Sequence, residues 1–267
     1  MSDRVLLMIF LQFIISTIGV TCYSSRIAGI ETKKLSTSFS IYNILTLGSR
    51  LANMILLPLL GAIVEIAIVN NDSTLLAKQF YYILGGILLG TFVGLLFIPF
   101  STKIFKEIVE KMSEYSNIFS LLIKECNFKN IKKLFKHCSI ISIKEIKEMK
   151  FSNFPMFPLI LNPLIVAINT ISYLSAMYAG VLVPESRLVA SQLSSTVNGI
   201  STILLYIFVD PAVGIISDQA INDRRSLSSV KAFIFYLGLG RLIGVIISFL
   251  LFIPAAYFIA DITKFIA

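Results

Sequence analysis

A stripe of polar side chains within an apolar stretch is the part of this sequence best suited to bind a charged ligand. Asn43, Thr46, Arg50 and Asn53 follow one another at steps of three and four residues, so on a helix they share one face. An arginine near a bilayer centre costs roughly 2.5–3.5 kcal/mol on insertion scales, so it usually faces a bundle interior, a water-filled cavity or an anionic ligand. A guanidinium also offers a fork of donors that suits phosphate oxygens. We therefore predict that this stripe binds substrate, with an internal ion pair of Arg50 with Glu65 or another carboxylate as the alternative.

A second polar stripe follows in the other half of the chain. Its members fall within one third of a helical circumference: Ser191, Ser194, Ser195, Asn198, Ser201 and Thr202. Ser195 and Asn198 are predicted to bind substrate together with the first stripe. Hydroxyls and amides in membrane helices often only hold neighbouring helices together, so packing alone stays open as the explanation.

Two further charges lie in apolar stretches. Asp210 directly precedes Pro211, the order expected where a helix begins, so the carboxylate is either a helix cap or a site for a coupling proton or cation. Arg241 lies ten residues after Lys231 and is expected to extend toward the membrane interface. Substrate binding is the functional alternative for Arg241.

The sequence gives no support for catalysis or metal binding. His137 is the only histidine, and it lies beside Cys138 and eleven residues after Cys126, a spacing that matches no usual metal site. A nucleophile motif and a phosphate-cradling glycine loop are also missing. We predict no catalytic residues, no metal, no cofactor and three reduced cysteines.

The elements that carry these residues are predicted to be membrane-spanning helices. The 267 residues are 56% hydrophobic and 14% charged, whereas soluble domains carry about 25% charged residues. A spanning helix needs about 20 apolar residues. Runs of that kind lie near 4–23, 37–69, 80–100, 156–180, 190–217 and 232–260. The fold class is therefore an all-α polytopic membrane protein with six transmembrane helices.

The two halves of the chain repeat each other. A shift of 155 positions lays Asn43 on Asn198 and the segment 95–99 on the identical segment 250–254. Three spans per half is an odd number, so the second copy enters the membrane in the opposite orientation, as in the inverted repeats of transporters. The predicted domains are a first three-helix repeat over 1–100, a basic amphipathic loop over 101–155 and a second three-helix repeat over 156–267.

Helices two and five are predicted to be broken or kinked. The run 37–69 would form a helix about 50 Å long, whereas the hydrocarbon core is about 30 Å thick. Pro58 and its repeat counterpart Pro211 mark the expected interruptions. A kink in a tilted helix is the simpler alternative to a complete break.

Basic residues predict the orientation of the chain. Of the 23 Lys and Arg residues, 17 fall in the connections after helices one, three and five, and Arg26 is counted among them. By the positive-inside rule these connections are cytoplasmic and both termini are extracellular. The net charge of +8 thus reflects membrane orientation, and we expect no nucleic-acid partner.

The loop 101–155 combines an amphipathic part with a more basic part. Between Ile104 and Ile123 apolar residues recur at helical spacing, which predicts a helix on the inner leaflet or on the bundle. The stretch 129–150 is rich in lysine and is either a solvated surface or a contact for anionic inner-leaflet lipids.

The chain resembles the Amj family of bacterial lipid II flippases, which are alternates to the MurJ family. The segments that carry the resemblance are 23–29, 43–45, 49–54 and 58–61 in the first half and 178–180, 190–195, 198–199, 210–211 and 241–244 in the second. The resemblance implies transport of undecaprenyl-pyrophosphate-linked disaccharide pentapeptide from the inner to the outer leaflet of the bacterial cytoplasmic membrane, for peptidoglycan synthesis. It brings no catalytic residues with it.

The residues alone leave other functions open. A secondary transporter of a small anionic solute would use the same polar stripes, and a membrane scaffold or an intramembrane acyl or phosphoryl transferase belongs to a different class. A lateral opening would favour a lipid, an occluded site at the midplane a small solute, and paired catalytic groups an enzyme. A homo-oligomer is compatible with the sequence.

Overall fold

The computed structural model describes residues 3–112, 139–142 and 154–267. Six helical segments in these residues are long and apolar enough to cross a membrane. They are α1 (Asp3–Thr21) continued by α2 (Ser24–Glu31), α3 (Leu35–Val69), α4 (Ser73–Leu96), α9 (Met156–Leu182), α10 (Arg187–Leu204) continued by η3 (Leu205–Val209) and α11 (Asp210–Ile221), and α12 (Leu227–Ile266). Two shorter helices are α5 (Ile98–Lys111) and η2 (Pro184–Ser186). The all-α, multi-pass architecture predicted from the sequence is confirmed.

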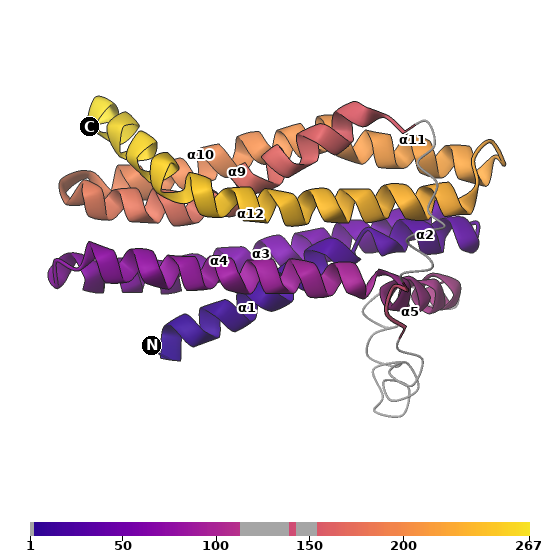
Figure 1. Cartoon of the computed structure of the whole chain (residues 1–267), viewed down its shortest axis with the longest axis horizontal. Helices are drawn as coiled ribbons and strands as arrows, with labels where there is room; N and C mark the ends of the chain where they lie inside the picture. The colour runs from indigo at the N-terminus through magenta and orange to yellow at the C-terminus, as the bar shows by residue number, and fades with distance from the viewer. Residues whose placement is uncertain (1–2, 113–138, 143–153) are drawn as a thin grey trace.

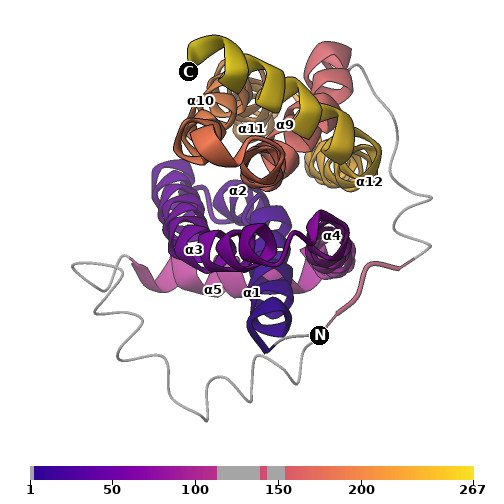
Figure 2. The ribbon, with the colours of Figure 1, turned by 90° about the vertical axis from the view of Figure 1, so that its left-hand side faces the viewer.

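The helices form two layers, one from each half of the chain. Helices α1 to α5 lie on one side, and α9 to α12 lie on the other (Figures 1 and 2). Both termini are at one end of the bundle, whereas the connection after α2, the helix α5 and the connection between α11 and α12 are at the opposite end (Figure 1). The basic connections of the chain therefore share one end.

The outer surface of the bundle is apolar over most of its length. Leu51, Met54, Ile55, Leu250 and Phe258 are each more than 60% exposed. In water such a surface would be strongly unfavourable, whereas in a bilayer these side chains contact lipid. Backbone polar groups are satisfied within the helices, as the hydrocarbon region requires.

Close helix pairs give each layer its rigidity. In the first half α4 packs mainly on α1, and in the second α12 packs mainly on α9. A Cβ atom at Gly86 would lie 2.8 Å from the carbonyl oxygen of Ile9, and at Gly90 it would meet the backbone of Phe13. Gly244 makes the same kind of approach to the backbone of Pro163. Glycine is needed at these points because any side chain would push the helices apart.

Helices two and five differ in how they pass the prolines. The expected break at Pro58 is not found, because α3 is one helix from Leu35 to Val69. In the second half the α-helical pattern gives way to a π-helical segment over Leu205–Val209, directly before Pro211. Segments of this kind are rare and are frequent at functional sites.

Helix one contains an interruption that the sequence did not predict. The chain turns at Cys22 and Tyr23, and α2 then continues the span to Glu31. Helix α5 packs on α2 and buries Phe105 and Val109. The described start of the predicted amphipathic region thus lies on the bundle, and the rest, 113–138 and 143–153, lies outside the described residues.

The glycine contacts give a stability prediction. Gly90→Ala should lower the free energy of unfolding by roughly 1–3 kcal/mol, because the new methyl overpacks the α1–α4 contact. Gly85→Ala is the matched control, since a Cβ at Gly85 meets nothing within 4 Å, and it should be neutral or slightly stabilising. Thermal unfolding of both variants in detergent measures the difference, and equal effects would contradict the packing argument.

Candidate functional site

A hydrogen bond between the two halves marks the centre of the candidate site. The Tyr42 hydroxyl of α3 donates to the Asp210 carboxylate of α11 over 3.0 Å. Asp210 is not the helix cap that the sequence favoured: Val209 occupies the cap position without a side-chain hydrogen bond, and Asp210 is the first residue of the helix. Its carboxylate contacts the other half because the π-helical segment before it shifts the register of the side chains.

Arg26 of α2 is buried beside this hydrogen bond. Only 1% of the residue is exposed, and its guanidinium carbon lies 3.1 Å from the centre of the Phe39 ring and 4.7 Å from that of Tyr42. Its Nε and Nη1 atoms have no hydrogen-bond partner among the described residues. The charge count placed Arg26 in a connection, which is wrong, because α2 extends helix one past the interruption.

Arg50 lies halfway along α3 and is exposed. Its guanidinium carbon is 5.1 Å from the centre of the Tyr206 ring, so it contacts the π-helical segment of the other half through a cation–π interaction. Arg26 and Arg50 both act electrostatically on the Asp210 carboxylate. The alternative pair with Glu65 is not formed, since Glu65 binds Arg187 over 2.9 Å.

Arg241 of α12 lies against α1. A Cβ at Gly19 would lie 2.6 Å from its Nη2 atom, and its Nε is buried without a hydrogen-bond partner. Gly19 is twelve residues from Glu31, the residue that binds Lys231 over 3.0 Å near the end of the bundle. The Arg241 side chain is half-buried and extends toward α1, and its extension toward the membrane interface stays a prediction.

The other members of the first stripe lie beside Arg50 with separate partners. Asn43 is exposed, and the Thr46 hydroxyl donates to the Asn43 carbonyl over 2.9 Å. The Asn53 side-chain oxygen accepts a hydrogen bond of 2.9 Å from Gln12 of α1. Asn53 thus helps to hold α1 and α3 together.

The second stripe behaves in the same way. Asn198 accepts a hydrogen bond of 2.7 Å from the Asn169 amide of α9, which also donates to the Ser201 hydroxyl over 3.1 Å. Ser195 is exposed on α10. The hydrogen bonds of Asn53 and Asn198 stay within their own halves, whereas Arg50 and Tyr42 contact Tyr206 and Asp210 of the other half.

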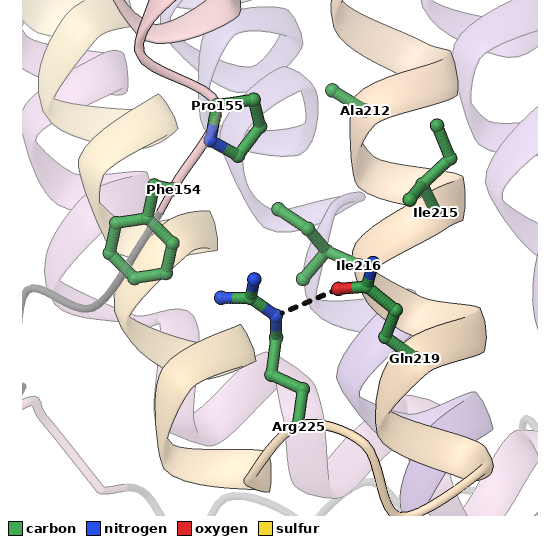
Figure 3. A pocket seen from close by; sticks show the side chains of 7 residues that line it. All are labelled: Phe154, Pro155, Ala212, Ile215, Ile216, Gln219 and Arg225. Carbon is green, nitrogen blue, oxygen red and sulfur yellow. Dashed lines mark hydrogen bonds between the residues drawn. The ribbon is translucent and has the colours of Figure 1, made fainter.

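A pocket of about 500 Å³ opens at the end of the bundle that carries the basic connections. It is lined by Phe154, Pro155, Ala212, Ile215, Ile216, Gln219 and Arg225. The Arg225 Nε donates to the Gln219 side chain over 3.0 Å (Figure 3). The pocket contains neither Arg50 nor Asp210, so it is separate from the charged cluster.

The chemistry of the cluster favours anion binding. The charged cluster described above contains three arginines, Arg26, Arg50 and Arg241, and one carboxylate, Asp210. Buried guanidinium groups without full hydrogen-bond partners are costly unless an anion completes them. In the part of the chain that the structure describes, no group of His, Cys, Asp and Glu could hold a metal ion.

Comparison with known proteins identifies the family. The model of the family described as Amj, alternate to MurJ, matches residues 11–263. The chain belongs to the Amj family. A curated relative, the lipid II flippase Amj of Bacillus subtilis (strain 168), is 29% identical over 264 residues, which are 98% of each chain. No solved structure matches. The Amj match covers the whole charged cluster, from Tyr23 to Arg241.

Proposed function

We propose that this chain is a lipid II flippase that moves the undecaprenyl-pyrophosphate-linked peptidoglycan precursor from the inner to the outer leaflet of the bacterial cytoplasmic membrane. Its membership of the Amj family and its near full-length similarity to a protein named lipid II flippase support this function. A flippase is a transporter, and transport requires no catalytic residue.

The observation that carries the proposal is the excess of positive charge at the contact between the halves. A pyrophosphate head group must cross the apolar region, and its desolvation is offset where guanidinium groups replace water. Arg50 offers its charge from an exposed position in the middle of α3, with Asn43 and Thr46 beside it. Asn53, Asn198, Ser195 and Arg241 extend this polar surface in the proposed path.

The exposure of the polar residues favours a lipid over a small solute. Asn43, Arg50, Ser195 and Asn198 are all exposed, although each lies well inside a spanning helix. Helix α3 packs on α1, α2 and α9 and has little direct contact with α10. A polar surface reached from the side lets a head group move along the protein while its prenyl tail stays in the bilayer, whereas a transporter of small anions would enclose its substrate.

We infer that the two halves are inverted repeats whose relative movement exposes the polar surface to each leaflet in turn. The equivalent glycine contacts of α4 with α1 and of α12 with α9 support this relationship, as does the interrupted helix five. An experimental structure can test it: the inference fails if 1–100 and 156–260 superpose only about an axis along the membrane normal.

The end of the bundle with the basic connections is proposed to be cytoplasmic, with both termini extracellular. Single cysteines at Asn70 and Arg224, both exposed at opposite ends, can report this in a chain without its native cysteines. An impermeant thiol reagent on intact cells should label Asn70→Cys and spare Arg224→Cys. The reverse pattern would invert the orientation and the proposed direction of entry.

The function is tested by rescue of a bacterium depleted of its other lipid II flippase, together with an assay of lipid II reaching the outer leaflet. The wild-type chain should restore growth and transport. Arg50→Gln should reduce transport at least tenfold and Arg50→Lys less, because lysine keeps the charge and loses the fork of donors. Arg224→Gln, at an exposed arginine outside the cluster, is the control and should transport normally. Normal transport by a well-folded Arg50→Gln chain would exclude the substrate role of Arg50.

Asp210 is the proposed site of ion coupling. Its carboxylate lies between the two halves and near two arginines, where gain of a proton or cation would change the contact between the halves. Asp210→Asn keeps an oxygen that can accept the Tyr42 hydrogen bond, so folding should be retained. We expect transport to fall and to lose its dependence on membrane potential and pH, and an unchanged dependence would exclude coupling through Asp210.

A further inference from the structure

The unsatisfied guanidinium of Arg26 is not explained by the packing around it. Neighbouring hydroxyls have partners: Ser38 donates to the Ser25 carbonyl over 2.7 Å, and Ser101 donates to the Ser24 hydroxyl over 3.0 Å. In the same region the Nε and Nη1 atoms of Arg26 are buried without an acceptor. The serine hydroxyls of this region thus have hydrogen-bond partners, whereas the Arg26 guanidinium, the strongest donor there, lacks acceptors for two of its nitrogen atoms.

The Asp210 carboxylate does not accept a hydrogen bond from Arg26 in this structure. The carboxylate accepts its hydrogen bond from Tyr42, and no ion pair within 4.0 Å joins it to Arg26 among the described residues. The rings of Phe39 and Tyr42 cover the guanidinium instead. Cation–π contacts stabilise a buried guanidinium less than the loss of its hydration destabilises it. A bound anion would offset the remaining cost of burying the Arg26 charge.

The position of Arg26 suits an early step of lipid transfer. It lies five residues from Glu31 at the basic end of the bundle, whereas Arg50 lies fifteen residues into α3 from that end. The two arginines therefore follow each other along the bundle, and Asp210 interacts with both. Phe39, which covers Arg26, is 36% exposed, so movement of this one ring would open a path from the surface.

We propose that Arg26 is a second binding residue for the pyrophosphate of the transported lipid, reached from the basic end before Arg50 and closed by Phe39 in the present conformation. The proposal rests on the proposed function. The ligand class is a prenyl pyrophosphate, because the guanidinium fork of Arg26 suits phosphate oxygens and the proposed substrate carries this group on a prenyl tail.

Binding of radiolabelled farnesyl pyrophosphate to the purified full chain in detergent tests this proposal. Arg26→Met should weaken binding at least tenfold while thermal stability is kept or raised, because a buried unpaired charge is removed. Arg225→Gln is the matched control. The Arg225 guanidinium also lies over an aromatic ring, 5.7 Å from the centre of Phe154, but Arg225 lies outside the cluster. This variant should bind farnesyl pyrophosphate with the affinity of the wild-type chain. Unchanged affinity in Arg26→Met would overturn the proposal, whether or not the thermal stability changes.

A second measurement does not depend on replacing Arg26. Phe39→Ala should raise the rate at which phenylglyoxal modifies Arg26, read by mass spectrometry of the peptide, and farnesyl pyrophosphate should then slow it several-fold. Protection by farnesol, or equal protection by dihexanoyl phosphatidylglycerol, would overturn the assignment to a prenyl pyrophosphate. If binding of farnesyl pyrophosphate depends on Arg26 but the chain does not rescue the depleted cells, the flippase function is refuted and the binding role of Arg26 is not. The failure of the proposed function is therefore distinguishable from the failure of this proposal.

Discussion

The structure depends on how an apolar bundle accommodates charge where its two halves meet. Asp210 accepts a hydrogen bond from Tyr42 and interacts electrostatically with Arg26 and Arg50. Through this hydrogen bond the carboxylate ties α3 to the second half. It offsets only part of the positive charge around it. We propose that the remaining positive charge attracts the anionic head group of the substrate.

The contacts within the halves and between them include both close packing and ion pairs. Each half is held by helices that meet backbone to backbone, as at Gly90 and Gly244. At the two ends, the halves are joined by the ion pairs of Glu65 with Arg187 and of Glu31 with Lys231, whose side chains are between 21% and 54% exposed. Partly exposed pairs contribute about 0–1 kcal/mol each. The ionic contacts between the ends therefore separate at little cost, whereas buried apolar contacts such as that of Phe80 with Phe252 also join the halves.

Much of this arrangement could be predicted from the sequence because membrane helices follow from long apolar runs. The six spans and the functional interest of Arg50 and Asp210 needed only hydropathy and helical spacing. Partners were harder to predict, since they depend on packing between distant segments. Asp210 was expected to cap its own helix, yet the π-helical turn before it directs the carboxylate to Tyr42. Arg26 was counted as a loop charge because nothing in local composition shows that α2 continues the first span.

The two polar stripes also show that hydrogen-bond partners on other helices cannot be predicted from helical spacing. Helical spacing grouped Asn53 and Asn198 with the polar stripes, but their hydrogen-bond partners Gln12 and Asn169 lie on other helices. Both amides therefore combine helix packing with a polar surface, an outcome that spacing alone could not decide.

The central claim is that positive charge at the contact between the halves carries a pyrophosphate head group across the membrane. Its most direct test is transfer between leaflets in proteoliposomes that contain only the purified chain. Two lipids should be compared: lipid II, and an analogue with the same tail and sugars in which a neutral linker replaces the pyrophosphate. The account predicts that lipid II crosses much faster than the neutral analogue. Equal rates for the two lipids, or no transfer of lipid II above protein-free liposomes, would contradict it.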